Sequence, residues 1–140
     1  MPEESTTPDL VELARRSTEA GNTDDFDLML SFWGPNPVWD LSPMGLGTYD
    51  GPAAIRGFFE DWTASYEEFE MNVEEVTELG RGVTFGVLLQ NARPVGSSGT
   101  VAIRYASVGV WVDGKMVRVT HYSDIDEGRA AAKRLAEERG

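Results

Sequence analysis

The stretch "GTVAIRYASVGVWVDGKMVRVTHYSD", residues 99–124, is the part of the chain that says most about the fold. Two largely apolar segments rich in β-branched residues, 99–112 and 115–123, flank the pair Asp113-Gly114. An Asp-Gly pair between two such segments is typical of a two-residue β-hairpin turn. The stretch therefore predicts a long antiparallel hairpin.

The turn also predicts which side chains of the hairpin share a face. In a two-residue turn Val112 opposes Lys115, and directly opposed residues lie on the same face of the sheet. One face then carries, from the first strand and then the second, Ala102, Arg104, Ala106, Val108, Val110, Val117, Val119, His121 and Ser123. An apolar floor with a few polar groups at one end is typical of a small-molecule pocket. A single β-bulge in the hairpin would exchange the faces.

Strands are also predicted upstream, over 69–79 and 82–92, together with a short strand, "VWDLS", at 38–42. Asp40 lies in this short strand.

Four helices are predicted around these strands. The first begins at Pro8, with Thr7 as its N-cap and Asp9 in its first turn, and stops at Gly21. The second runs from Phe26 to Trp33 before "GPNP". The third carries a stripe at 3.6-residue spacing, and the fourth covers 127–139. The stripe consists of Ile55, Phe58, Phe59, Trp62 and Tyr66. Helices followed by an antiparallel meander indicate the α+β class, with the helices against one face of a single sheet.

Length and charge narrow the possible roles. A chain of 140 residues suits one domain, which we expect over 8–140 after a disordered tail at 1–7. With 24 acidic and 12 basic residues, the formal charge of −12 disfavours binding to nucleic acid or to a membrane surface. The N-terminus "MPEESTTPD" has neither the basic nor the apolar part of a signal peptide, so the default expectation is a cytoplasmic protein.

The segments "YDGPAAIRGFF" at 49–59 and "DGKMVRVTHYSD" at 113–124, in this order of elements, resemble the SnoaL-like branch of the nuclear transport factor 2 superfamily. The resemblance extends from about Leu10 to Leu135. It implies a cone-shaped, curved antiparallel or mixed sheet with the N-terminal helices packed on its concave face. It also implies an apolar cavity for a small molecule and a homodimer formed through the convex face. Isomerases, cyclases, epoxide hydrolases, dehydratases and non-catalytic domains all have this fold.

The enzymes of this superfamily offer partial templates. By resemblance to the steroid isomerases, Asp40 stands where the catalytic base would be. The position of their tyrosine falls near Arg16 or Ser17, and that of their second acid near Ala106 or Ser107, so both hydrogen-bond donors are missing. By resemblance to the limonene-type epoxide hydrolases, Arg104 matches the arginine, but Ala106 and His121 replace the two aspartates. SnoaL-type cyclases take acid–base residues from the last strand, where His121 and Asp124 lie.

Three residues are therefore candidates for catalysis. Asp40 would take a proton, with its pKa raised by Trp39, Phe59 or Trp62 around it. His121 would donate or relay a proton, and Arg104 would stabilise the developing anion. The structural alternatives are a turn carboxylate, a core histidine and an ion-paired arginine. The residues expected to contact the substrate are Trp33, Tyr49, Phe59, Trp62, Ala106, Val108, Val119 and Ser123.

The function expected from these residues is that of a cofactor-free acid–base enzyme, an isomerase, cyclase or lyase. Its substrate would be a small apolar carbonyl or hydroxyl compound. One histidine and no cysteine make a metal site improbable. The alternative is a non-catalytic binding or dimerisation domain whose cone is filled by Phe58, Phe59 and Trp62. An epoxide hydrolase is a third possibility.

Overall fold

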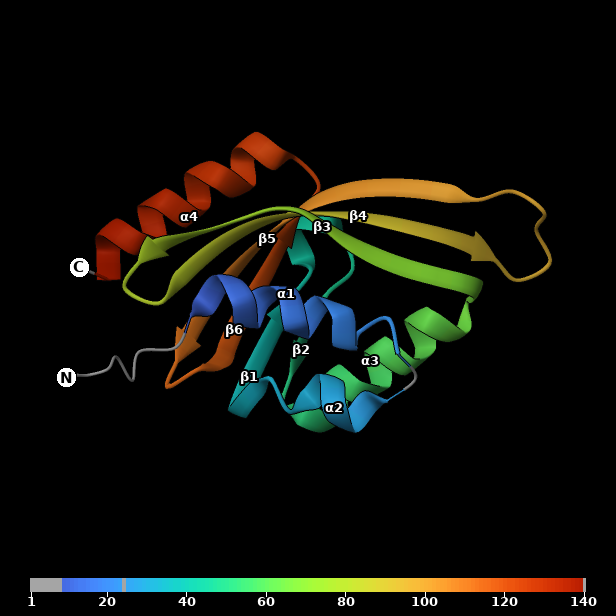
Figure 1. The fold of residues 1–140 in the computed structure, drawn as a ribbon, viewed down its shortest axis with the longest axis horizontal. Helices are drawn as coiled ribbons and strands as arrows, with labels where there is room; N and C mark the ends of the chain where they lie inside the picture. Colours follow the sequence, from blue (N-terminus) through green and yellow to red (C-terminus); the bar gives the residue numbers. More distant parts are fainter. Residues whose placement is uncertain (1–8, 24, 140) are drawn as a thin grey trace.

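The computed structural model describes residues 9–23 and 25–139, and within them the α+β class is confirmed (Figure 1). The expected tail at 1–7, which includes the predicted N-cap Thr7, lies outside the described residues, and so does Pro8. The elements, in chain order, are α1 (Leu10–Ala20), α2 (Phe26–Leu30), β1 (Trp33–Asp40), the 3-10 helix η1 (Ser42–Met44), β2 (Thr48–Asp50), α3 (Pro52–Ala64), β3 (Tyr66–Gly80), β4 (Val83–Pro94), β5 (Val101–Val112), β6 (Lys115–Tyr122) and α4 (Ile125–Arg139).

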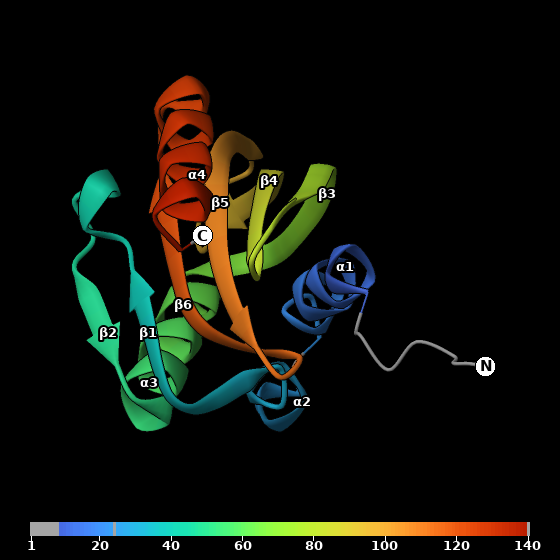
Figure 2. The ribbon, with the colours of Figure 1, turned by 90° about the vertical axis from the view of Figure 1, so that its left-hand side faces the viewer.

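The six strands form one curved sheet in the order β2-β1-β6-β5-β4-β3, which Figure 2 shows from side to side. β1 runs parallel to β6, and all other neighbouring strands are antiparallel, so the sheet is mixed. Asp113 and Gly114 have φ values of 53° and 77°, as a tight hairpin turn with two left-handed residues requires. The predicted Asp-Gly turn is therefore confirmed.

The helices cover both faces of the sheet, although the sequence predicts them on one. α1, α2 and α3 lie against the concave face, as expected, whereas α4 lies on the opposite face (Figure 1). α4 buries Gly128, Ala132 and Ala136, which recur every fourth residue on one side of the helix. These small residues pack on the opposite face against a group that includes Val83, Phe85 and Val108.

The predicted register of the β5–β6 hairpin is wrong beyond its first two pairs. Val112 opposes Lys115 and Trp111 opposes Met116, as expected, but Val110 opposes Arg118. Val117 is therefore an extra residue on β6, a β-bulge that shifts all later pairs by one. Because side chains alternate along a strand, the shift keeps His121 and Val119 on the concave face and moves Ala106 and Val108 to the face under α4.

The second predicted helix is also too long. α2 ends at Leu30, and Trp33 to Pro37 belong to β1, the strand that pairs with β2 and β6. Asp9, expected in the first turn of the first helix, is its N-cap: its carboxylate accepts a hydrogen bond from the backbone N–H of Glu12. Asp25 caps α2 in the same way, by accepting from the backbone N–H of Leu28.

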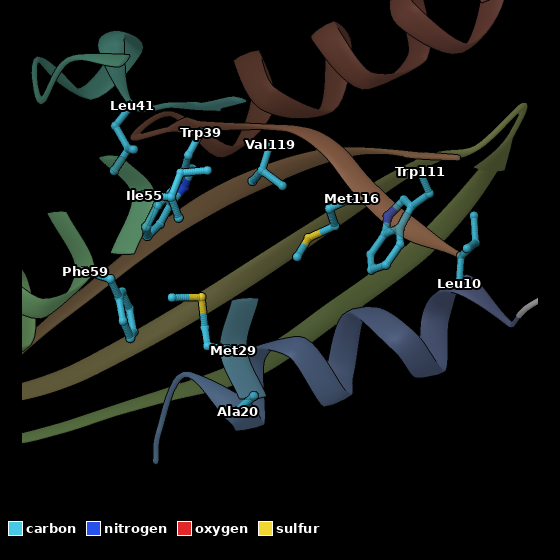
Figure 3. Packing of buried hydrophobic residues seen from close by; sticks show 10 residues of the cluster. All are labelled: Leu10, Ala20, Met29, Trp39, Leu41, Ile55, Phe59, Trp111, Met116 and Val119. Carbon is cyan, nitrogen blue, oxygen red and sulfur yellow. The ribbon is translucent and has the colours of Figure 1, made fainter. Parts of the chain in front are cut away.

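The main core fills the space between the concave face and the three N-terminal helices. In Figure 3 the side chains of Trp111, Met116 and Val119 extend from the sheet towards α1, while Phe59 and Ile55 approach from α3. Ile55 and Phe59 are fully buried, and Phe58 and Trp62 pack against the same core, so these four residues of the predicted stripe face it. The fifth, Tyr66, belongs to β3 and not to the third helix.

Candidate active site in the concave face

A cavity of about 100 Å³ remains within this core, between α1 and the concave face. α1 covers it with Ala14, Ser17 and Thr18, and two hydrogen bonds between the Asn22 side chain and the backbone of Met71 fasten the end of α1 to β3. Strands β1, β3, β4, β5 and β6 contribute residues to the wall, including Trp33, Trp39, Thr84, Gly86, Leu88, Ser107, Gly109, Trp111, Met116, Val119 and His121. The wall is thus mainly apolar and aromatic.

His121 is a titratable residue in this wall, and its side chain is buried. It is only 4% exposed, and burial lowers its pKa to about 3, so the ring is uncharged at neutral pH. The Trp39 indole N–H donates to Nε2 at 3.4 Å, a long hydrogen bond that leaves the imidazole proton on Nδ1. Nδ1 has no hydrogen-bond partner within the described residues.

An unpaired buried nitrogen is a cost to the folded protein. Leaving a buried donor unsatisfied costs about 1–3 kcal/mol, so His121 holds hydrogen-bonding capacity that a bound acceptor could use. The nitrogen is itself covered by protein atoms. A ligand in the cavity therefore reaches it only after the neighbouring side chains adjust.

Ser107 is the cross-strand neighbour of His121 on β5. The two residues are directly opposed on β5 and β6, which places their Cβ atoms about 5 Å apart on the concave face. On the other side, Ser107 opposes Gly86 of β4, which has no side chain to fill the space. A second polar pair is internally satisfied, because the Trp111 indole N–H donates to the Thr84 hydroxyl at 2.9 Å.

Among the described residues, the cavity wall contains no aspartate, glutamate, lysine or arginine. Within residues 9–23 and 25–139, no three histidine, aspartate or glutamate side chains gather closely enough to hold a metal ion. The wall can thus offer hydrogen bonds and apolar contact to a ligand, but no formal charge.

Asp40 lies outside this cavity. Its neighbour Trp39 lies in the wall, so the alternation along β1 directs Asp40 to the other face. There its carboxylate accepts hydrogen bonds from the backbone and hydroxyl of Ser42, from Thr48 and from the Arg118 guanidinium, the last at 2.7 Å. Burial alone would raise its pKa, but these bonds and the Arg118 charge outweigh burial and hold the pKa below its ordinary value. The expectation of a raised pKa is wrong.

Comparison with known proteins agrees with this architecture. The family model of the SnoaL-like domain matches residues 14–119, which is most of the chain. The chain belongs to the SnoaL-like family. A search of curated proteins finds no match for its sequence.

Solved structures similar to this SnoaL-like protein cover nearly the whole chain. A Catenulispora acidiphila protein with a ketosteroid isomerase-like fold, in complex with trimethylamine, is 13% identical, with a TM-score of 0.73 over 91% of this chain and 94% of that one. TerC with polyporic acid is 20% identical, with a TM-score of 0.70 over 91% and 97%. A Shewanella putrefaciens protein proposed to be a SnoaL-like polyketide cyclase is 11% identical, with a TM-score of 0.69 over 92% and 98%. These likenesses show the shared fold.

The SnoaL-like protein does not bring Arg104 to the cavity. Arg104 lies at the exposed end of β5, where its guanidinium makes a two-point ion pair with Glu74 of β3. Ala106 and Val108 lie beneath α4. These three positions were expected on the cavity face, and the bulge at Val117 is the reason for the difference.

The remaining predicted contact residues divide into two groups. Trp33, Phe59 and Val119 line the cavity. Trp62 lines a neighbouring groove, and Tyr49 stacks on Phe58 with ring centroids 4.3 Å apart. Ser123 is exposed before α4, where Asp124 caps the helix by accepting from the backbone N–H of Glu127.

Several residues of the wall went unrecognised in the sequence. Trp39, expected only as a neighbour of Asp40, is itself a wall residue, and Trp111 and Met116, which are not among the expected contact residues, also line the cavity. The sequence does offer a signal for Trp39, since a large apolar side chain beside a charged one in a short strand indicates that the apolar side chain faces the core. Trp111 and Met116 had none, because their side depends on the bulge.

Among the described residues, no helix combines the length and apolar character needed to cross a membrane.

Proposed function

We propose that the concave cavity binds a small, uncharged, largely apolar molecule with a carbonyl or hydroxyl oxygen, and that His121 acts on that oxygen. The observation that carries the proposal is the unpaired, buried Nδ1–H of a histidine in an aromatic wall. Apolar walls with one placed polar group are what small-molecule sites use for orientation.

The chemistry follows from the charge state of the ring. A neutral imidazole donates a hydrogen bond to a carbonyl oxygen and polarises it, as an uncharged histidine does in triosephosphate isomerase. Polarisation makes the neighbouring C–H more acidic: the proton leaves to a water molecule, and the Nδ1–H stabilises the enolate that forms. Return of a proton to the same or another carbon completes an isomerisation, and attack of the enolate on a second carbonyl gives a cyclisation.

This assignment supports an enzyme of the isomerase, cyclase or lyase type in which His121 is the acting residue. Asp40 and Arg104 are left out because they lie away from the cavity in ion pairs with Arg118 and Glu74. Complexes of fold relatives with trimethylamine and with polyporic acid add support for small-molecule binding in such a fold.

A second candidate is binding without turnover. It is favoured by one observation, the lack of any carboxylate among the described residues of the cavity wall. A strong base is then missing, and the ligand would be held unchanged.

Exchange of the α-hydrogens of cyclohexanone in D2O tests the first candidate and separates it from the second. We expect the protein to accelerate exchange, with a C–H proton lost to solvent and a deuteron returned, and we expect His121→Phe to abolish the acceleration. Binding of cyclohexanone without faster exchange would support the non-catalytic alternative. Methylcyclohexane, which has no acceptor, controls for apolar contact alone. If neither compound bound, the cavity assignment would be wrong.

A further inference from the structure

A second hollow, which we call the groove, lies beside the cavity and has a volume of about 380 Å³. Its walls are the side chains of Phe58 and Trp62 from α3, Tyr66 from β3 and Tyr105 from β5. Leu46 and Ile103 also line the groove. Their side chains are 43% and 40% exposed, so large apolar side chains face solvent there. An occupant of the groove would cover both.

Gln90 of β4 also lines the groove, and its side-chain oxygen is unpaired there. The residue is 1% exposed, and its Oε1 has no hydrogen-bond partner within the described residues. A primary amide presents a donor and an acceptor side by side, so its complement is another amide-like edge. Buried side-chain amides are normally paired, and an unpaired one points to a missing partner.

The charges around the groove limit the partner further. Among the described residues that line it, Asp61 is the one with a charged side chain, and the chain as a whole carries a formal charge of −12. Both features disfavour an anion. The aromatic walls favour a flat ring.

We propose that the groove is a second binding site, for an uncharged planar ring carrying a carboxamide or lactam, and that Gln90 recognises the amide edge. The ring lies between Phe58, Trp62 and Tyr66, and the amide pairs with the Gln90 side chain. Neither the proposed carbonyl chemistry nor His121 is required for this binding.

Tyr105 separates the groove from the cavity. Its ring lies 4.9 Å from the His121 ring, centroid to centroid, and its hydroxyl points to the Met71 sulfur at 3.0 Å. Tyr105 lines the groove, whereas His121 and Met71 line the cavity. The Tyr105 side chain therefore lies between the groove and the cavity.

The four tryptophans allow the two sites to be followed separately. Trp62 lines the groove, whereas Trp33, Trp39 and Trp111 line the cavity. Titration with benzamide, followed by the indole N–H signals in NMR spectra, should move the Trp62 signal in a saturable way and leave the other three nearly in place. Trp62→Phe assigns that signal.

Matched probes and one variant test the role of Gln90. Methyl benzoate lacks the N–H donor and benzoate carries a negative charge, so both should bind at least about fivefold more weakly than benzamide, the change expected for about one hydrogen bond. Gln90→Met, which keeps the length of the side chain, should weaken benzamide to the level of methyl benzoate. The probe comparison in the unmodified protein needs no variant to fold.

The proposal is wrong if benzamide moves only the cavity signals, or if methyl benzoate binds as well as benzamide. It is also wrong if folded Gln90→Met binds benzamide with unchanged affinity. Failure of ketone binding in the cavity with benzamide still bound would overturn the proposed function and leave the groove site intact.

Discussion

The charge state of His121 is set by its neighbours on the concave face. The ring is packed edge-on against Trp39 and beside Tyr105, and among the described residues no carboxylate lines the cavity wall to favour the imidazolium ion. Burial then dominates and lowers the pKa of His121 to about 3. A neutral ring is suited to polarise a carbonyl, and it is a weak proton donor.

The lowered pKa makes stability depend on pH. Between the unfolded value of about 6.5 and the folded value, the unfolded chain binds a proton that the folded protein does not, so acidification through this range destabilises the fold. The largest slope from one such group is about 1.4 kcal/mol per pH unit. We expect urea unfolding of His121→Phe to show a shallower loss of stability below about pH 6 than the unmodified protein. Parallel curves would contradict a buried neutral ring.

Asp40 supports structure on the other side of the sheet. Asp40→Asn removes the charge that Arg118, Ser42 and Thr48 satisfy, so we expect a loss of about 1–3 kcal/mol in the free energy of unfolding. Because the residue lies outside the cavity, ketone binding and the His121 signals should stay unchanged. A His121 pKa that moves in Asp40→Asn would show that the two groups share one site.

At the scale of elements, the β-bulge at Val117 explains most of what the sequence could and could not predict. The Asp-Gly turn, the strand pair and the apolar stripe of α3 follow local rules, and all are present. The face on which each β5 side chain lies does not follow local rules. One extra residue on β6 moves the β5 side chains from one face of the sheet to the other, and nothing in the local sequence marks it. Arg104 was lost from the predicted site for that reason, whereas His121 was retained.

The face of the sheet that α4 covers could not be predicted from the sequence of the helix either. Its buried side consists of Gly128, Ala132 and Ala136, which give little hydrophobic contrast. The helix approaches β5 so closely that a Cβ on Gly128 would lie 2.6 Å from the Cβ of Ala106. Small residues are therefore what allows α4 to cover the sheet.

Two glycine substitutions test this close approach. In an open helical position Gly→Ala stabilises a protein by about 0.5–1 kcal/mol. Gly57 of α3 is such a position, because a Cβ there meets nothing within 4 Å. We expect Gly57→Ala to raise the melting temperature and Gly128→Ala to lower it, through overpacking that costs about 1–3 kcal/mol. A gain of stability in both variants would mean that α4 is loosely placed.

At the scale of the whole molecule, the acidic charge and the two-sided sheet restrict possible assembly. α4 covers part of the face through which a homodimer was expected. The homodimer stays a prediction, and a contact through this face would have to use the strand surface that α4 leaves free.

Light scattering after size-exclusion chromatography measures the assembly directly. A homodimer predicts twice the chain mass of 15.4 kDa. Because the formal charge of −12 opposes self-association, a dimer should gain stability with added salt. A mass of one chain at all salt concentrations would rule out the dimer.

The most direct test of the proposed site is the long-range ¹H–¹⁵N NMR spectrum of the imidazole. Because the chain has one histidine, the imidazole signals need no assignment. Spectra between about pH 8 and pH 5, with and without cyclohexanone, report both the protonation and the ligand contact of His121. We predict a neutral ring with its proton on Nδ1 throughout this range, and a shift of the Nδ1 signal when the ketone binds. A titration midpoint near 6.5, or a bound ketone that leaves Nδ1 unmoved, would contradict the assignment of His121 as the group that acts on the ligand.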